Sequence, residues 1–400
     1  MPSFGTVEDL PPEQRLLVRL DLNAPVEEGV VKDNRRFSRH AETVERLLDD
    51  GHALALLAHQ GRPGRDTFVS LGQHAEILAD HLDREVEFVA DTFGEEALEA
   101  IDDLAGGEVL LLENVRMCDE ELPEKTPEEH AESEFVRTLA PEFDAYVNDA
   151  YSAAHRAHAS IVGFPLVMDA YAGPVMETEY TANSAIRERE FDRVTMVLGG
   201  TKAEDLIPVI ERLEGVDRFC LGGIVGELFL RAAGHDVGYD VESDLFDDQW
   251  DENREEIKET LETHGDRLVL ASDLAYEDDA GERAEVAVDG VEKETSFLDV
   301  GSDTVATYAD HVSESDAVFV KGALGVFEDE RFSDGTVGVL RAIADTDCFS
   351  VVGGGDTSRA IPMYDLPEDA FSHVSIAGGA YVAALTGEEL VAIEVLERDG

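Results

Sequence analysis

The chain has 400 residues, 43% of them hydrophobic, so it is long enough to bury a large core and to form two or three domains. Its formal net charge is −59, from 90 acidic against 31 basic residues, which argues against a protein that binds nucleic acid or an anionic membrane. The three cysteines are widely spaced and odd in number, so they predict neither a metal site nor a disulfide framework.

The high charge has two possible explanations, disorder and life in molar salt. Apolar segments recur along the whole chain, which argues against disorder. In molar salt the Debye length falls to about 3 Å, so the self-repulsion is screened. We therefore expect a halophile, an archaeon that accumulates salt. The chain start lacks the basic and apolar parts of a signal peptide, and no apolar run reaches about 18 residues, so we expect a cytoplasmic protein.

Short apolar runs that predict strands alternate with longer amphipathic segments that predict helices. The predicted strands are, in chain order, 16–22, 53–58, 86–90, 109–113, 145–148, 160–163, 193–198, 218–221, 267–271, 317–320 and 348–352. The predicted helices are 39–50, 71–82, 128–139, 205–213, 251–263, 304–312 and 336–344. This alternation is typical of α/β proteins whose parallel sheets are covered by helices on both faces.

The number of strands is large for one sheet, so we expect two doubly wound domains. The polar, helix-compatible segment 173–190 lies midway and is the predicted connector. The charged, glycine-punctuated segment 277–294 is expected to be an excursion on the surface. Ligands of open α/β sheets bind beyond the carboxyl ends of the strands, so the candidate site residues are those that follow each strand.

In the first half of the chain, polar and basic residues follow the strands. They are Asp21, Asn23, Arg36, His59, Arg62, Arg116, His155, Arg156 and His158. Arginine forks match carboxylate and phosphate oxygens, so the pattern favours a basin for a small, multiply anionic ligand over isolated surface ion pairs. His155 and His158 have the spacing of metal ligands, but a phosphate contact or a loop hydrogen bond is favoured because no third ligand has a telling spacing.

In the second half, glycines follow the strands. Gly199-Gly200-Thr201-Lys202 and Gly353-Gly354-Gly355-Asp356-Thr357 are the clearest cases. Consecutive glycines and a helix start suit a phosphate group, and an aspartate beside them suits its Mg²⁺. The alternative is a tight turn in which Asp356 or Thr357 is the N-cap residue. There is no Walker A sequence and no G-x-G-x-x-G, so a dinucleotide dehydrogenase loses its main support.

These segments together resemble the phosphoglycerate kinase family over nearly the whole chain, in the archaeal form. The motifs that carry the resemblance are VRLDLNAP (18–25), HQGRP (59–63), LLENVR (111–116), NDAYSAAHRAH (148–158), LGGTKAED (198–205), LDVGSDT (298–304), GVFE (325–328), VVGGGDTS (351–358) and SHVSIAGGA (372–380).

The resemblance implies two Rossmann-like three-layer domains and a division of the ligands between them. Residues 1–172 would bind 3-phosphoglycerate, 173–190 would form the interdomain helix, 191–372 would bind the nucleotide, and 373–400 would return to the first domain. It assigns the triose-phosphate site to Asp21, Asn23, Arg36, His59, Arg62, Arg116 and Arg156. It assigns the nucleotide site to Lys202, Glu328, Gly353, Gly354, Gly355, Asp356 and Thr357, with Asp356 on Mg²⁺.

The implied reaction is reversible phosphoryl transfer from 1,3-bisphosphoglycerate to ADP, as in glycolysis and gluconeogenesis, by a monomer that closes about a hinge. Arg36, Lys202, Mg²⁺ and the helix start at Gly378 and Gly379 are the candidates that stabilise the transferring group. Three departures from the family pattern stand out: Leu206 in place of a second lysine, Lys321-Gly322-Ala323 in place of Asn-Gly-Pro, and Ile376-Ala377 before the last glycines. A non-catalytic nucleotide-binding protein and another acyl-phosphate kinase are the alternatives.

Overall fold

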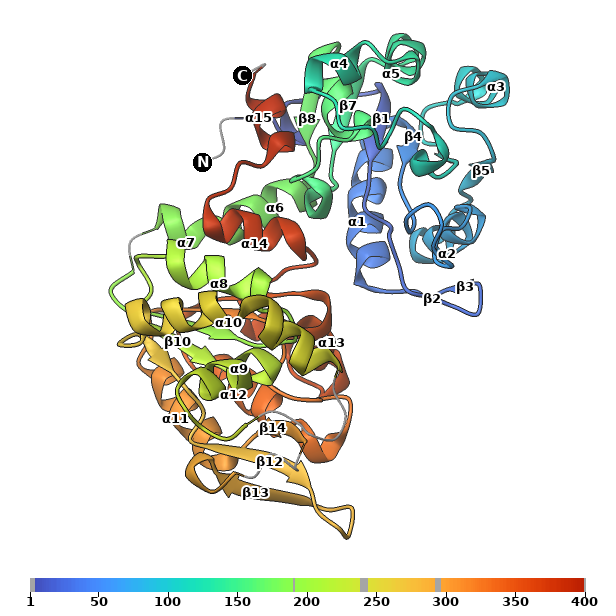
Figure 1. The fold of residues 1–400 in the computed structure, drawn as a ribbon. Coiled ribbons are helices and arrows are strands. Elements are labelled where there is room, and N and C mark those ends of the chain that lie inside the picture. The colour runs from blue at the N-terminus through green and yellow to red at the C-terminus, as the bar shows by residue number, and fades with distance from the viewer. Residues whose placement is uncertain (1–3, 190, 238–243, 292–295, 399–400) are drawn as a thin grey trace. The chain divides into compact units, whose positions relative to one another are not determined.

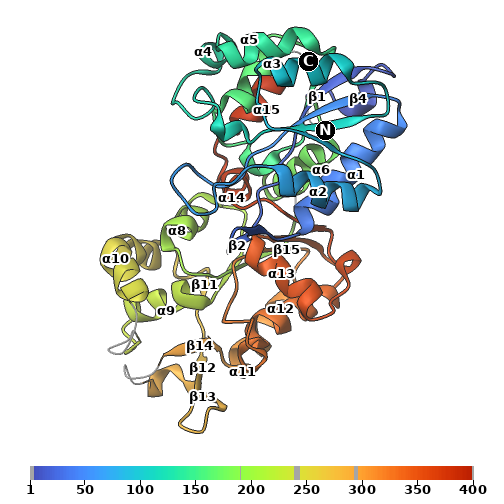
Figure 2. The ribbon, with the colours of Figure 1, turned by 90° about the vertical axis from the view of Figure 1, so that its right-hand side faces the viewer.

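The computed structural model describes residues 4–189, 191–237, 244–291 and 296–398, without the side chains of Glu188, Asp244 and Asp356. The chain divides into two compact units (Figures 1 and 2). Unit 1 comprises Met1–Thr181 and Glu389–Gly400, and unit 2 comprises Ala182–Glu388. Among the described residues, no helix combines the length and the apolar character that crossing a membrane requires.

Unit 1 is built on a parallel six-stranded sheet in the order β5-β6-β4-β1-β7-β8. Its strands are β1 (Arg15–Arg19), β4 (Ala53–Leu57), β5 (Glu87–Val89), β6 (Val109–Leu112), β7 (Ala145–Asn148) and β8 (Ala170–Ala172), and β2 (Val26–Glu27) and β3 (Val30–Val31) form a separate hairpin. Its helices are α1 (Arg35–Asp49), α2 (Gly72–Leu82), α3 (Glu95–Asp103), α4 (Pro127–Ala131), α5 (Glu134–Leu139) and α15 (Val391–Glu397), and it holds the first part of α6 (Pro174–Asn183).

The sequence explains the layering of unit 1. Every residue of β4 is apolar and buried, as expected for a strand covered on both faces. The helix α1 begins after Asn34, whose side chain accepts a hydrogen bond from the backbone N–H of Arg36 at 2.8 Å. The C-terminal helix α15 lies beside β8 and completes this unit (Figure 1).

Unit 2 repeats the plan with a parallel sheet in the order β11-β10-β9-β15-β16-β17. Its strands are β9 (Val194–Leu198), β10 (Arg218–Leu221), β11 (Leu268–Val269), β15 (Ala317–Lys321), β16 (Phe349–Gly353) and β17 (His373–Val374). Its helices are α7 (Ala185–Glu188), α8 (Ala203–Arg212), α9 (Gly223–Ala232), α10 (Asp244–His264), α11 (Ser302–Ser313), α12 (Asp334–Ala344), α13 (Gly355–Met363) and α14 (Gly379–Thr386). The predicted α/β class with two parallel sheets is confirmed.

An antiparallel sheet at one end of unit 2 was not predicted (Figures 1 and 2). It has the order β13-β12-β14, with β12 (Asp273–Glu277), β13 (Arg283–Ala287) and β14 (Phe297–Val300). The predicted surface excursion 277–294 therefore contains a paired strand. The sequence does not predict this strand, because none of the described side chains of β13 is buried and the strand therefore lacks an alternating apolar pattern.

Two sequence-based predictions in unit 1 are wrong. The apolar segment 160–163 is not a strand but part of a π-helical turn, η5 (Ala159–Gly163), because Glu121 accepts hydrogen bonds from both the N–H and the hydroxyl of Ser160 at 2.7 Å. The predicted helix 128–139 is two helices, since Ser133 caps the start of α5.

The division of the chain also differs from the predicted boundaries. The helix α6 spans the point at which unit 1 gives way to unit 2, and residues 373–388 belong to unit 2. The reason is α14, which packs against α8 and lays the ring of Tyr381 over Gly353. The return to unit 1 thus begins at Glu389 rather than at 373.

Candidate active site

In unit 1 the candidate residues gather at the point where the strand order reverses. From β1 the chain continues on one side to β4 and later on the other side to β7, so the carboxyl ends of β1 and β7 flank a crevice. Asp21 and Asn23 follow β1, and Ser152 follows β7 in the turn η4 (Tyr151–Ala153). This is the position at which open α/β sheets bind ligands.

Asp21 is the centre of a hydrogen-bonded group in this crevice. Its Oδ2 lies 3.2 Å from Nη1 of Arg36 and accepts a hydrogen bond from the hydroxyl of Ser152. The same Arg36 nitrogen donates to the backbone carbonyl of Asn23 at 2.7 Å, and His59 Nδ1 lies 3.9 Å from Asp21 Oδ1. Burial alone would raise the pKa of Asp21, but the charge of Arg36, the largest of the opposing effects, and the hydrogen bond from the Ser152 hydroxyl help to hold the pKa below its ordinary value.

The other predicted arginines of unit 1 act on one another at short range. Burial, followed by the charges of Arg156 and Arg19, lowers the pKa of Arg116 to about 10. Burial, followed by the charge of Arg62, also lowers the pKa of Arg156. Arg116 donates to the backbone carbonyl of Gly61, which fixes its direction. Guanidinium groups that depress one another's pKa form a pre-arranged positive field, although the chain as a whole is strongly acidic.

Sequence reasoning missed a second set of hydrogen-bonded residues, which holds the backbone of Asp21. His40 Nε2 accepts the backbone N–H of Asp21 at 3.2 Å, and its Nδ1 lies 2.9 Å from Oδ2 of Asp149. Asp149 also accepts the hydroxyl of Thr43 at 2.7 Å and the N–H of Val175, the second residue of α6, at 2.8 Å. The available signal was a histidine and a threonine on the apolar face of α1.

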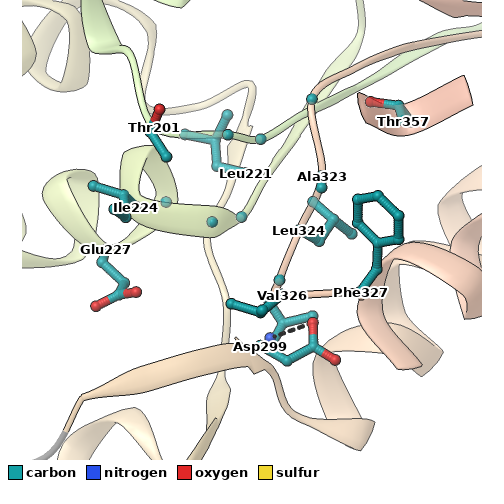
Figure 3. Close-up of a pocket in the computed structure, with 18 of the residues that line it drawn as sticks. Thr201, Leu221, Ile224, Glu227, Asp299, Ala323, Leu324, Val326, Phe327 and Thr357 are labelled. Carbon is teal, nitrogen blue, oxygen red and sulfur yellow. Dashed lines mark hydrogen bonds between the residues drawn. The ribbon is translucent and has the colours of Figure 1, made fainter. Parts of the chain in front are cut away.

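The strongest candidate site in unit 2 is a pocket with a cavity volume of about 710 Å³, within the usual range for small-molecule sites. Its lining comes from the carboxyl ends of β9, β10 and β15 and from the starts of α9 and α13 (Figure 3). The strand order reverses between β9 and β15, so this site too lies at a topological switch point. Thr201 and Ile224 lie on one side of the pocket, and Phe327 and Thr357 lie on the other (Figure 3).

Most of the predicted nucleotide residues line this pocket. They are Lys202, Glu328, Gly354, Gly355 and Thr357, and Gly378 lies among them. Thr357 is fully buried, and its Oγ1 has no hydrogen-bond partner in the described structure. The side chain of Asp356 lies outside the described residues. A buried, unpaired hydroxyl in a pocket wall is placed to bond a polar ligand.

The three glycines at the end of β16, Gly353 to Gly355, have different roles. A Cβ on Gly353 would lie 2.1 Å from the ring of Tyr381, so this glycine serves packing and is not part of the pocket lining. Gly354 has φ +101° and is the N-cap residue of α13, so neither Asp356 nor Thr357 caps the helix. Nothing lies within 4 Å of a Cβ on Gly355, which therefore leaves its backbone open to a ligand.

The departures from the family pattern lie in or near the pocket. Leu206 is buried in the pocket wall, and Lys321 lines the same pocket as Lys202. Ile376 and Ala377 are buried before α14, which begins at Gly379 with Gly378 as its N-cap residue. Among the described residues, no three histidine, cysteine or acidic side chains form a metal-binding group, so the interpretation of His155 and His158 as metal ligands gains no support.

Comparison with known proteins decides between the functions that the sequence left open. The family model described as phosphoglycerate kinase matches residues 8–388. The chain belongs to the phosphoglycerate kinase family. Its activity is therefore reversible phosphoryl transfer between 1,3-bisphosphoglycerate and ADP, as the sequence predicted.

Relatives of this family confirm the halophilic archaeal type. The chain is 70% identical to the phosphoglycerate kinase of Halorubrum lacusprofundi, over 99% of this chain and 98% of that protein. It is 68% identical to that of Haloarcula marismortui, over 99% of this chain and all of that protein.

Solved structures of the family share the fold. The phosphoglycerate kinase of Pyrococcus horikoshii matches with a TM-score of 0.93 at 31% identity, and that of Coxiella burnetii with a TM-score of 0.80 at 30% identity. Each match covers 99% of both chains.

Proposed function

We propose that the kinase binds the triose phosphate on unit 1 and the nucleotide on unit 2. The observation that carries this proposal is a cluster of arginines, Arg36, Arg116 and Arg156, near the strand ends of unit 1 in a chain that is strongly acidic as a whole. A cluster of fixed guanidinium groups suits a small ligand with a phosphate and a carboxylate. Lys202 and the glycines of unit 2 suit a nucleotide's phosphates in the same way.

On unit 1, Arg36 is our candidate for the group that stabilises the transferred charge. Its side chain is about one quarter exposed and is held by Asp21 and by the Asn23 carbonyl, which fix its direction. Asn23 Oδ1 also accepts the N–H of Gly61 at 2.8 Å, which joins the loops after β1 and β4. We assign Arg62, Arg116 and Arg156 to the phosphate and carboxylate of the triose, with His59 as a hydrogen-bond donor.

On unit 2, the assignments follow the pocket wall. Gly354 and Gly355 would offer backbone to the phosphates, Lys202 would neutralise their charge, and Glu328 would bond the ribose. The helix start at Gly378 and Gly379 would add N–H donors near the transferred group. Lys321 lines the same pocket.

The pocket also fits a magnesium ion carried by the nucleotide. Mg²⁺ requires oxygen ligands and is usually bound by few carboxylates together with phosphate oxygens. The unpaired Thr357 hydroxyl is an oxygen donor in the pocket wall, and Asp356 precedes it in the first turn of α13. Asp356 would hold the ion, which when bound would neutralise charge on the phosphates.

The chemistry requires positioning and charge stabilisation rather than proton transfer. The acceptor oxygen is a carboxylate in one direction and the β-phosphate of ADP in the other, and both are ionised near neutral pH. No general base is needed, so the rate depends on alignment and on cations that match the charge of the transferred group. Arg36 and Lys202 are our candidates for these cations. The reaction belongs to glycolysis and gluconeogenesis, and we expect a cytoplasmic monomer.

A coupled assay of ADP formation from MgATP in molar KCl tests the transfer reaction on which this proposal rests. With 3-phosphoglycerate as acceptor we expect saturable turnover, and with acetate none. Turnover of acetate alone would indicate another acyl-phosphate kinase. Nucleotide binding without any turnover would indicate a non-catalytic binding protein.

A further inference from the structure

His59, which follows β4, is held in one tautomer by its neighbour Arg19. His59 is 5% exposed, and its Nδ1 lies 3.0 Å from Nη2 of Arg19. A guanidinium group has N–H donors and no acceptor, so Nδ1 of His59 must supply a lone pair. The ring proton of neutral His59 is then on Nε2.

Arg19 is itself fixed by bonds at all three of its nitrogens. Nε donates to Ser160 Oγ at 2.8 Å, Nη1 donates to the backbone carbonyl of Leu20, and Nη2 donates to His59. Since Nε can only donate, the Ser160 hydroxyl must use its own proton on Glu121 Oε1, at 2.7 Å. The donor and the acceptor of each hydrogen bond from His59 through Arg19 and Ser160 to Glu121 are therefore determined. Arg19 has no exposed surface and holds His59 from inside the unit.

The charges around His59 also favour the neutral ring. Burial is the largest effect and lowers its pKa, Asp21 raises it, and Arg19, Arg116 and Arg36 lower it again, so the pKa stays well below the ordinary value. A second proton on Nδ1 would also point at the N–H of Arg19. Geometry and charge therefore agree that His59 carries a single proton, on Nε2.

We propose that Arg19 is a positioning residue that keeps His59 as the neutral Nε2–H tautomer, so that His59 presents a hydrogen-bond donor without a charge to the triose phosphate. The inference rests on the proposed role of His59 in unit 1. It gives Arg19 a task different from that of the other arginines, which face the ligand. It also means that substrate binding is not titrated by this histidine in the pH range in which histidines normally change charge.

The test is a long-range ¹H–¹⁵N spectrum of the full-length enzyme, labelled at histidine nitrogen, in molar KCl. The His59→Gln variant identifies the His59 signals among the 12 histidines. We expect an unprotonated Nδ1, a protonated Nε2 and no titration between about pH 5 and 8. A protonated Nδ1, or an ordinary titration near pH 6.5, would overturn the proposal even if the enzyme is fully active.

Variants at position 19 separate positioning from simple stability. In Arg19→Met the His59 signals are expected to titrate, and KM for 3-phosphoglycerate should acquire a pH dependence in addition to that of the wild type. Arg19→Lys, which keeps a donor, should restore part of the wild-type spectrum. Arg15→Met, at the other end of β1, is the matched control and should leave His59 unchanged. If Arg19→Met folds and His59 keeps its single tautomer without titrating, Arg19 does not have this role.

Discussion

Nη1 of Arg283 lies 3.1 Å from Oδ2 of Asp299, and this pair joins the antiparallel sheet of unit 2 to its pocket. Asp299 lines the pocket and also accepts the N–H of Gly335 at 2.8 Å. A Cβ on Gly325 would lie 2.3 Å from Oδ1 of Asp299, so the loop that leads to Glu328 rests directly on this carboxylate. The sheet that sequence analysis missed is therefore a support of the proposed nucleotide site.

Arg283→Ala should weaken nucleotide binding about tenfold and leave 3-phosphoglycerate binding unchanged. Loss of the charged hydrogen bond to Asp299 should also lower the free energy of unfolding by about 1.5–3 kcal/mol. Arg331→Ala is the matched control, because Arg331 makes ion pairs with Glu277 and Asp329 at the surface and should be close to wild type in both respects. Calorimetric titration with each ligand measures the difference. Equal losses of nucleotide affinity in the Arg283 and Arg331 variants would contradict a specific role of Arg283 in supporting the nucleotide site.

Gly353 and Gly355, at the end of β16 and just after it, allow packing to be separated from ligand contact. Gly353→Ala should lower the free energy of unfolding by about 1–3 kcal/mol, because the added methyl group meets the ring of Tyr381. Gly355→Ala has open space around it and should keep wild-type stability, but the methyl group would enter the phosphate position and raise the Kd for MgADP. Denaturant titrations and MgADP titrations of both variants give the answer. A Gly353→Ala protein with wild-type stability would show that the ring of Tyr381 leaves room for a methyl group at this position.

Arg36→Ala should lower kcat by about 10²–10³-fold, the range found when one donor to a developing charge is removed. The Kd for nucleotide should change little, because Arg36 belongs to unit 1. Steady-state kinetics with saturating ligands, together with direct nucleotide binding, separate the two effects. A variant with normal kcat would remove Arg36 from charge stabilisation.

Sequence patterns predicted the class and most of the buried strands, and the roles of the site residues that follow them stay predictions. The patterns failed where side-chain hydrogen bonds decide the local structure. The apolar segment 160–163 forms a helical turn because Glu121 accepts hydrogen bonds from Ser160. The hydrophobic pattern of the segment cannot predict a contact with a residue so far away in the sequence. Arg19 was overlooked because the predicted strand 16–22 includes it, and its partners Ser160 and His59 are distant in sequence. The triglycine segment was recognised, but the packing role of Gly353 depends on Tyr381, which comes later in the chain.

The depressed pKa of Asp21 predicts a pH-dependent contribution to stability. Because the pKa is lower in the folded than in the unfolded state, ionised Asp21 stabilises the fold fully at pH values above its unfolded pKa of about 3.9. The contribution is lost as the pH falls from there toward the folded pKa. The difference in unfolding free energy between wild type and Asp21→Asn, measured in molar KCl, should be constant at higher pH and shrink below about pH 4. A difference that grows with acidification would have the wrong sign.

The division of the ligands between the two units is the central claim, and paired calorimetric titrations of Arg156→Ala and Lys202→Ala test it most directly. Arg156→Ala should lose at least tenfold in affinity for 3-phosphoglycerate and keep the wild-type Kd for MgADP, because one charge-assisted hydrogen bond contributes about 1.5–3 kcal/mol. Lys202→Ala should show the reverse. Loss of 3-phosphoglycerate binding in Lys202→Ala, or of MgADP binding in Arg156→Ala, with both proteins folded, would contradict the assignment.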